Sequence, residues 1–243
     1  MKLSKILFGG AVLALSLAFV GCATEEDEND MISFSGSKGS ISYTNEGSEN
    51  SRGFVTMKTK HKSSDCLIKV TNAKLVSSNS SPMGYIFGLT QDKTTKTYNF
   101  GVVGFSVRSG TLNYYVDWCK NVNPATLSEG RDFLNMEGNN AGTPIVATWT
   151  AINDIDIGNK SDFSVYLDLE AKDDGSYTLQ LYKADKETKI VSETEISNTV
   201  TGFETLTQTD FGCYANVYAG GTLEGTWEFA NTQGEGVPVE YVE

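Results

Sequence analysis

The chain has 243 residues, 39% of them hydrophobic and 21% charged, and its 31 acidic and 19 basic residues give a formal net charge of −12. A chain of this length and composition suits a single globular domain with one core. The acidic excess excludes nucleic acid and bare anionic membrane as electrostatic partners.

Residues 1–21 have the pattern of a secretory signal. Lys2 and Lys5 precede an apolar run over residues 6–20, which is shorter than the about 20 residues that span a bilayer as a helix. The run leads into Phe19-Val20-Gly21-Cys22, which resembles a lipobox, the motif in which the cysteine thiol takes diacylglycerol. The resemblance implies an exported chain that binds the lipid bilayer through acyl chains on Cys22. The alternative is an ordinary signal in which the cysteine is incidental.

An acidic block follows Cys22. Residues 25–28 are all acidic and Asp30 adds a fifth acid, so residues 22–30 are predicted to form a disordered tether of roughly 30 Å. Such a block after a lipidated cysteine resembles the surface-export signals of some diderm lipoproteins; the alternative is a solvated linker without a sorting role. We expect the outer membrane or cell surface rather than the inner membrane. Removing residues 1–21 takes away two lysines, which changes the charge from −12 to −14.

From Met31 onward, apolar residues alternate with polar ones and turn residues recur, which predicts an all-β chain. About thirteen short strands suit two stacked antiparallel sheets in a single β-sandwich domain, residues 31–243. Residues 121–142 lack a clean period and form the longest predicted loop, with a helical turn at 127–136, and long loops are often functional. Outside a central meander, strands are expected at 31–36, 39–44, 52–58, 65–76, 83–90, 97–108, 111–119, 144–152, 209–218 and 221–230, with a weak tail at 237–241.

The meander begins with the clearest strand, residues 162–170. Phe163, Val165, Leu167 and Leu169 point to one face there, and Ser164, Tyr166 and Asp168 point to the other. Asp-Gly at positions 174–175 provides the residues that a tight hairpin needs. The predicted second strand follows and contains Tyr177, Leu179 and Leu181. Residues 189–197 are predicted to form the third strand of the meander.

Lipidation of Cys22 leaves Cys66, Cys119 and Cys213. In an oxidising compartment one disulfide is expected, with Cys119 and Cys213 as the preferred pair. The alternative is three small buried core residues. The chain has no Cys-x-x-Cys spacing and a single histidine, His61, so neither a metal site nor a histidine-dependent hydrolase is predicted unless His61 is the base.

Three stretches together resemble the concanavalin A-like lectin/glucanase sandwich, a jelly-roll fold. They are Gly84–Leu89 with Tyr98–Val107, the meander over residues 161–184, and Phe211–Tyr218 with Thr222–Phe229. The resemblance implies that the last long strand closes the sandwich beside the N-terminal strand. It also implies a fold shared by lectins, glycoside hydrolases and polysaccharide lyases, so the fold alone does not give the function.

The hydrolase branch of that family carries Glu-x-Asp-x-(x)-Glu on one strand, where alternation puts the carboxylates on one face. Asp154 and Asp156 resemble the first two positions, but Gly158 stands in place of the acid. Glu193 and Glu195 form a second candidate pair, with Ser197 in the third position. The alternative for both pairs is ordinary solvent-facing acids.

Sugars are recognised by aromatic platforms with neighbouring amide and carboxylate groups. Alternation puts Leu112, Tyr114, Val116 and Trp118 on one face of a strand and three candidate ligand-binding residues on the other. The non-core faces of the meander carry two more pairs of a tyrosine with a polar residue. The alternative interpretation is that all these tyrosines are structural and stabilise the sheet through cross-strand contacts. The candidates are Asn113, Tyr115 and Asp117 on the first strand, and Tyr166 with Asp168 and Tyr182 with Gln180 on the meander.

Two further sites have simple structural explanations. Trp149 and Trp227 are expected in the core, since Trp227 alternates with polar neighbours. Asp173 and Asp174 in a turn would suit a structural calcium ion, but the chain lacks a D-x-D-x-D-G series and turn chemistry explains both residues. No other cofactor is predicted.

The expected function is binding of a carbohydrate, or of a host or envelope macromolecule, by an anchored lectin-like sandwich. The first alternative is a divergent glycoside hydrolase or lyase that uses one of the two acidic pairs. The second is a structural envelope lipoprotein without a small ligand.

Overall fold

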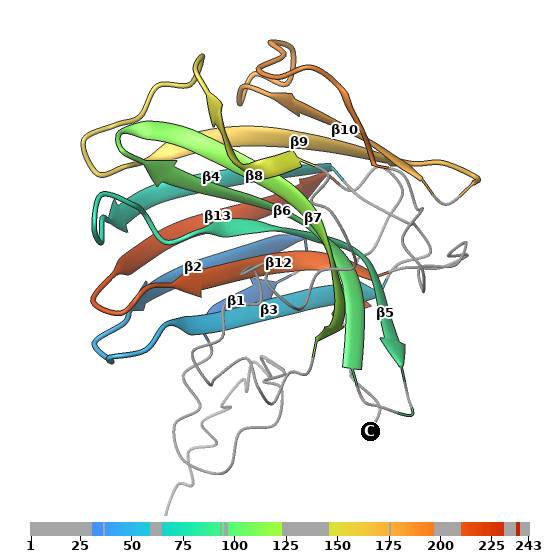
Figure 1. The fold of residues 1–243 in the computed structure, drawn as a ribbon, viewed down its shortest axis with the longest axis horizontal. Coiled ribbons are helices and arrows are strands. Elements are labelled where there is room, and N and C mark those ends of the chain that lie inside the picture. The colour runs from blue at the N-terminus through green and yellow to red at the C-terminus, as the bar shows by residue number, and fades with distance from the viewer. Residues whose placement is uncertain are drawn as a thin grey trace, which may run out of the picture.

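In the computed structural model of the chain, two antiparallel β-sheets stack face to face (Figure 1). The structure describes residues 31–35, 37–58, 65–92, 94, 97–122, 146–174, 176–196, 210–230 and 237–238. Every regular element among these residues is a β-strand. No helix in this part of the chain is long and apolar enough to cross a membrane. The predicted all-β, two-sheet sandwich is confirmed.

Sheet A contains seven strands in the order β1-β2-β13-β4-β9-β10-β11. The long strand β13 pairs with β2, so the last long strand lies beside the N-terminal hairpin, as the resemblance implied. The strands are β1 (Ile32–Ser35), β2 (Lys38–Thr44), β13 (Thr222–Ala230), β4 (Asp65–Lys74), β9 (Phe163–Ala171), β10 (Tyr177–Tyr182) and β11 (Thr194–Ile196).

Sheet B also contains seven strands, in the order β14-β3-β12-β5-β6-β7-β8. In Figure 1 the strands β5, β6 and β7 bend strongly toward one end of the sandwich. The strands are β14 (Val237–Pro238), β3 (Ser51–Lys58), β12 (Asp210–Val217), β5 (Met83–Asp92), β6 (Thr97–Arg108), β7 (Thr111–Val122) and β8 (Val146–Ile152).

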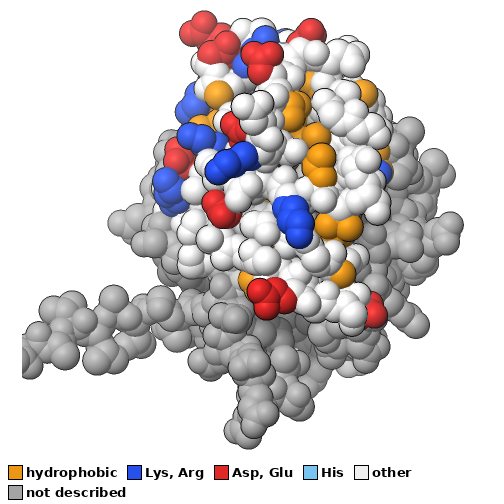
Figure 2. Space-filling view, turned by 90° about the vertical axis from the view of Figure 1, so that its left-hand side faces the viewer, with side chains coloured by type: hydrophobic (Ala, Val, Ile, Leu, Met, Phe, Trp, Pro, Cys, Tyr) orange, Lys and Arg blue, Asp and Glu red, His pale blue; other side chains and the backbone are white. Residues whose placement is uncertain are grey.

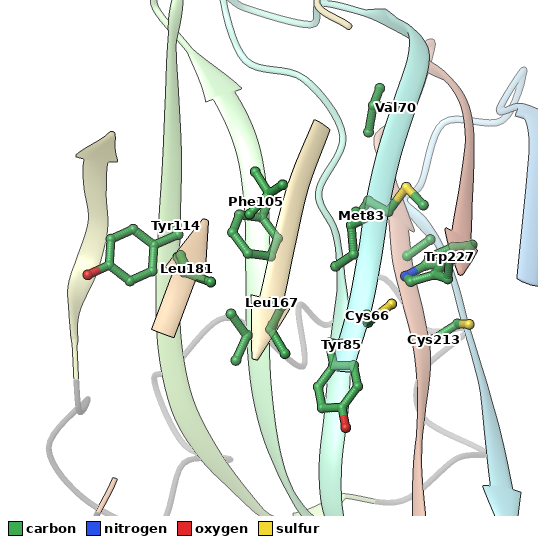
Figure 3. Close-up of a cluster of buried hydrophobic side chains, with 14 of the residues drawn as sticks. Cys66, Val70, Met83, Tyr85, Phe105, Tyr114, Leu167, Leu181, Cys213 and Trp227 are labelled. Carbon is green, nitrogen blue, oxygen red and sulfur yellow. The ribbon is translucent and has the colours of Figure 1, made fainter. Parts of the chain in front are cut away.

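The main core fills the space between the sheets, and alternating residues of both sheets supply it (Figure 3). Leu167 and Leu181 come from sheet A, and Phe105 and Tyr114 from sheet B; all are buried. Removing each such side chain from water contributes roughly 1.5–3 kcal/mol, which makes this core the main source of stability. Trp227 links the sheets directly, since its indole Nε1 donates a hydrogen bond of 2.7 Å to the carbonyl oxygen of Gly84.

The predicted strands agree with the observed ones, and the third member of the meander is shorter than expected. Only Thr194–Ile196 pairs with β10, while Lys189 makes an isolated bridge to Tyr182. The turn before Lys189 is organised by Asp185, whose carboxylate accepts hydrogen bonds of 2.8 Å from the backbone N–H groups of Glu187 and Thr188. The predicted helical turn at 127–136 lies outside the described residues.

The predicted disulfide between Cys119 and Cys213 is wrong. Cys66, Cys119 and Cys213 are buried thiols, which matches the alternative of three core residues. Two strands, β5 and β6, separate β7 from β12, so Cys119 and Cys213 are about 14 Å apart across the sheet, whereas a disulfide needs Cα atoms within about 7 Å. The two side chains also point to opposite faces of sheet B.

One end of the sandwich, on the left of Figure 1, presents a mixed surface (Figure 2). Lysine and arginine side chains are interspersed with acidic ones there, beside a stripe of hydrophobic side chains. The described residues of this face form no extended patch of positive charge of the kind that binds nucleic acid.

Candidate functional site

Four of the predicted ligand-binding residues come together on the outer face of sheet A. The register of β9 and β10 pairs Asp168 with Gln180 and Tyr166 with Tyr182. The two tyrosine rings lie 6.2 Å apart between centroids at an angle of 57°. Alternation made this possible, because Leu167, Leu169, Leu179 and Leu181 take the core side of the same strands.

Asp65, at the start of β4, is a member of this site that the sequence did not reveal. Leu67 pairs with Tyr166 and Cys66 with Leu167, so the next position in register puts Asp65 opposite Asp168. The Tyr166 hydroxyl donates a hydrogen bond of 2.8 Å to Oδ2 of Asp65. In the sequence, Asp65 alternates with the core residues of β4, which indicates that it faces away from the core. Only the pairing of β4 with β9 shows that it lies beside Asp168.

The carboxyl group of Asp168 lies close to that of Asp65 and is affected by its charge. Burial is the largest cause that raises the pKa of Asp168 to about 6, followed by the charge of Asp65 and a hydrogen bond with it. The charges of Glu170 and Glu193 raise this pKa further. Burial and the proximity of Asp65 also raise the pKa of the Tyr166 hydroxyl, so it stays a hydrogen-bond donor.

Gln180 lies on β10, beside Asp168 of β9, and is 4% exposed. Its Nε2 donates hydrogen bonds of 3.1 Å to the carbonyl oxygen of Leu181 and 2.8 Å to that of Val191. Both partners are acceptors, which fixes the orientation of the carboxamide. The Oε1 atom is buried and has no hydrogen-bond partner among the described residues.

The connection from β10 to β11, residues 183–193, first returns beside β10 as an extension of the hairpin. The backbone N–H of Ile190 donates a hydrogen bond of 3.0 Å to the carbonyl oxygen of Leu181. Lys186 in this connection has a φ of 64°, an unusual value for a residue with a side chain. Its Nζ atom lies 4.7 Å from the centroid of the Tyr166 ring. An ammonium group therefore already lies against the aromatic part of the site.

The other predicted binding residues, Asn113, Tyr115 and Asp117, lie on the outer face of sheet B, which is the opposite side of the sandwich. They are 8%, 1% and 3% exposed. Asn113 donates a hydrogen bond of 2.8 Å to the carbonyl oxygen of Thr111, and Asp117 accepts one of 2.8 Å from the backbone N–H of Trp118. The structure therefore separates the predicted residues into two groups that cannot contact one small ligand.

Tyr115 belongs to a second apolar cluster on this outer face of sheet B. Its ring lies 4.6 Å from that of Trp149 at 69°. Trp149 was expected in the core, but it packs on this outer cluster, with the Arg108 guanidinium 4.1 Å from its ring. Trp227 does lie in the core. Ile152 on the same strand lies in the main core, so alternation itself puts Trp149, three residues earlier, on the outer face.

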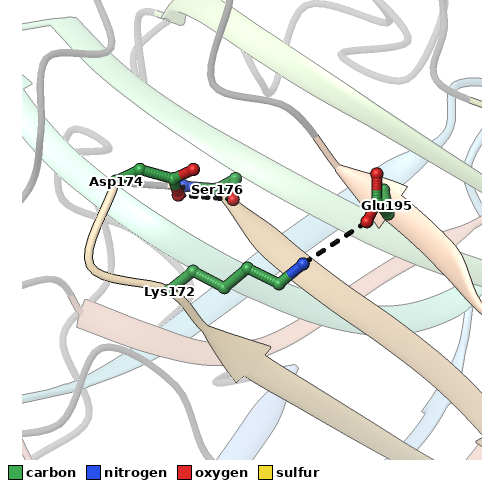
Figure 4. A network of polar contacts seen from close by, with 4 residues as sticks. All are labelled: Lys172, Asp174, Ser176 and Glu195. Carbon is green, nitrogen blue, oxygen red and sulfur yellow. Dashed lines mark hydrogen bonds and ion pairs between the residues drawn. The ribbon is translucent and has the colours of Figure 1, made fainter.

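The two acidic pairs proposed for hydrolysis lie in different segments of the fold. Asp154 and Asp156 are exposed in the connection between β8 and β9, not on a strand, so alternation does not put them on one strand face. Glu193 precedes β11 and contributes to the charge around Asp168. Glu195 lies on β11 opposite Thr178, and its carboxylate is 3.5 Å from Nζ of Lys172 (Figure 4).

The turn that carries Asp173 and Asp174 follows its predicted chemistry. The Asp174 carboxylate accepts hydrogen bonds from Ser176, 2.9 Å from its backbone N–H and 2.5 Å from its hydroxyl (Figure 4). These bonds lower the pKa of Asp174. Among the described residues, no group of three acidic, histidine or cysteine side chains is placed to hold a metal ion.

Comparison with known proteins gives only remote similarities. No family model and no curated protein matches the chain. Among solved structures, a legume lectin-like domain from Entamoeba histolytica is 9% identical, with a TM-score of 0.46, over 82% of this chain and 86% of that one. A scytalido-glutamic peptidase with a transition-state analog inhibitor is 12% identical, with a TM-score of 0.37, over 78% and 76%.

A further similar structure is an engineered GH43 glycoside hydrolase, 12% identical with a TM-score of 0.35 over 86% of this chain and 42% of that one. These proteins have unrelated activities, and at such identities the likeness concerns the arrangement of strands and not the site. The function has to be argued from the outer face of sheet A itself.

Proposed function

We propose that the chain is an exported, lipid-anchored protein whose β-sandwich binds carbohydrate through the outer face of sheet A. One observation carries the binding part of the proposal. The β9–β10 register brings Tyr166 and Tyr182 beside Asp168 and Gln180, so two aromatic rings and two polar groups share one surface.

This combination matches the chemistry of a sugar. The C–H faces of a pyranose pack on aromatic rings, and its hydroxyl groups pair with carboxylate and amide groups that fix its orientation. Tyr182 and Asp168 are half-buried, so parts of both side chains reach the surface while their conformations are held by packing. A preorganised surface of this kind loses little conformational entropy when a ligand binds.

The anchoring part of the proposal rests on the first 22 residues. The cations, the apolar run and Cys22 support export and acylation, and residues 22–30 then act as the tether. The partners are the lipid bilayer through acyl chains on Cys22, and a glycan or an extracellular macromolecule that carries one. The proposed location is the outer membrane or cell surface.

Binding is tested on a glycan array with the full processed protein in detergent. We expect a defined set of glycans to bind, and Tyr182→Ala to weaken binding at least tenfold because it removes half of the aromatic surface. Thr178→Ala, on the same strand and face, is the matched control and should bind normally. If no plant, mucin or matrix glycan binds, the proposal is contradicted and a structural envelope protein is favoured.

Anchoring is tested separately by incorporation of a labelled fatty acid in the producing cell. The wild-type chain should be labelled and should fractionate with membranes, whereas Cys22→Ser should be unlabelled. Labelling that survives this substitution would show that acylation at Cys22 does not occur.

A glycoside hydrolase or lyase is the second candidate, and the Asp65–Asp168 pair favours it. A carboxyl group with a pKa of about 6 is suited to act as a general acid near neutral pH. Retaining hydrolysis needs carboxyl groups about 5 Å apart, so the hydrogen-bonded pair would have to separate around a substrate. Release of reducing ends from a bound glycan, abolished by Asp168→Asn, would establish this activity.

A further inference from the structure

We infer that the outer face of sheet A binds a primary ammonium group, and that Lys186 is the chain's own occupant of this position. For the carbohydrate-binding function proposed above, on which this step rests, the ligand class is then an amino sugar whose nitrogen carries no acyl group.

The first observation is the contact between Lys186 and Tyr166. A cation within about 6 Å of the centroid of an aromatic ring is attracted by the ring's negative face. The Nζ atom of Lys186 lies 4.7 Å from the Tyr166 centroid. The turn around Asp185 holds the lysine there, and the φ of 64° at Lys186 shows that this placement is not the relaxed conformation of a lysine. The site thus already accommodates an ammonium group.

The second observation is the charge around that ring. The row Asp65, Asp168 and Gln180 crosses three strands, and the acids Glu170 and Glu193 lie close enough to act on Asp168. Neither Asp168 nor Glu193 forms an ion pair with a described residue. An incoming cation would therefore offset repulsion that the protein itself leaves in place.

The third observation is the buried Oε1 atom of Gln180, which has no partner among the described residues and lies next to Asp168 in register. A buried acceptor without a partner has lost its hydrogen bonds to water and gains from any donor that reaches it. An ammonium group has three N–H donors and no acceptor. Asp168 and Gln180 each offer this ammonium group an acceptor oxygen. The ring of Tyr166 provides a surface that attracts its charge.

Lys186 and a ligand would compete for this place. The connection of residues 183–193 holds both Lys186 and Val191, the acceptor of Gln180 Nε2, so release of Lys186 from the ring loosens the cover over Gln180. A ligand ammonium that replaces Nζ then gains access to the Oε1 atom and to the carboxylate of Asp168.

The test compares two oligosaccharides that differ only at nitrogen, a glucosamine trimer and an N-acetylglucosamine trimer, by calorimetry with the full processed protein in detergent at pH 7. We expect the free amine to bind at least tenfold more tightly, and high salt to weaken only this ligand. Lys186→Met keeps an unbranched apolar side chain and removes the competing ammonium group, so amine binding should tighten severalfold. Lys74→Met, exposed at the opposite end of β4 from Asp65, is the matched control and should change nothing.

Asp168→Asn should weaken amine binding at least tenfold while keeping a hydrogen-bond donor for Asp65, and thermal melting checks that the variant is folded. Equal binding of both trimers would overturn the ammonium inference and leave carbohydrate binding intact. Binding of other glycans but neither trimer would also overturn it. If the protein binds neither trimer and no glycan on the array, the proposed carbohydrate-binding function itself is wrong. Amine binding unaffected by Lys186→Met would overturn the role of Lys186.

Discussion

The outer faces of the two sheets differ although the same alternation produced both. On β7 of sheet B, the outward residues Asn113, Tyr115 and Asp117 are all at least nine-tenths buried. On β9 of sheet A, the outward Tyr166 is 8% exposed, but Ser164 and Asp168 are half-buried and Glu170 is exposed. The alternation of a strand tells which residues share a face, but it does not tell whether that face meets water.

The chemistry of the two faces follows this difference in burial. Sheet B carries an apolar outer cluster in which Tyr214 and Ile86 are fully buried, so its tyrosines act as structural side chains. Sheet A carries acids whose charges are close together and half-solvated. A polar and aromatic pattern is therefore a candidate ligand surface on one sheet and a second core on the other.

The largest expected effect separates the tyrosines of the two faces. Tyr214→Ala removes a fully buried ring and should lower the free energy of unfolding by about 3–5 kcal/mol. Tyr182→Ala, on the half-buried face, should cost about 1 kcal/mol or less. Chemical denaturation measures both. Equal losses would show that the two faces are packed alike.

A smaller effect is expected from a methyl group added between β6 and β7. The Cβ of Gly104→Ala would lie 2.1 Å from the ring of Tyr115, which must shift within a packed layer. The expected loss is about 2 kcal/mol in the free energy of unfolding. Gly110→Ala separates backbone strain from packing, because its Cβ would meet no atom within 4 Å while its φ is 81°. It should lower the free energy of unfolding by about 1 kcal/mol. A smaller loss at Gly104 than at Gly110 would argue against close packing on this face.

The electrostatic effect on sheet A is smaller and depends on pH. Because the pKa of Asp168 is raised from 3.8 to about 6 in the folded state, the folded protein binds more protons than the unfolded chain between these values. Stability is therefore lost as pH rises through this window. Asp168→Asn should be more stable than wild type by up to about 1 kcal/mol at pH 7.5, after allowing for solvent screening, and equal to it below about pH 4. Thermal melting at the two pH values gives the difference; a variant less stable at pH 7.5 would contradict the assignment.

The smallest effect concerns the cysteines. Cys119 lies in the outer cluster of sheet B and Cys213 in the main core, so the losses from Cys119→Ala and Cys213→Ala should add, with a coupling energy below about 0.5 kcal/mol. Burial also raises the pKa of the Cys213 thiol, so it should resist alkylation until the protein unfolds. Strong coupling, or a mobility shift on reduction, would indicate a disulfide.

The sequence predicted the strands because apolar alternation was strong, as in Phe163, Val165 and Leu167, and it predicted the grouping of Tyr166 with Asp168 for the same reason. It could not predict strand order, since pairing between β4 and β9 depends on packing across almost a hundred residues. Asp65 was missed for this reason, and Cys119 was paired with a residue on the other face. The oxygen of Gln180 and the turn of Lys186 depend on side-chain conformation, which alternation does not contain.

The strand order of sheet A affects how far the proposed ligand surface lies from the N-terminal edge of the domain. The proposed tether would precede β1, on one edge of the sheet, whereas Tyr182 lies on β10, five strands away or about 24 Å across the sheet. If residues 22–30 add their maximum of roughly 30 Å, the ligand surface of an anchored molecule could reach up to about 50 Å from its own bilayer. Such a molecule is placed to meet polymers or surfaces that face the membrane and not molecules that lie on it.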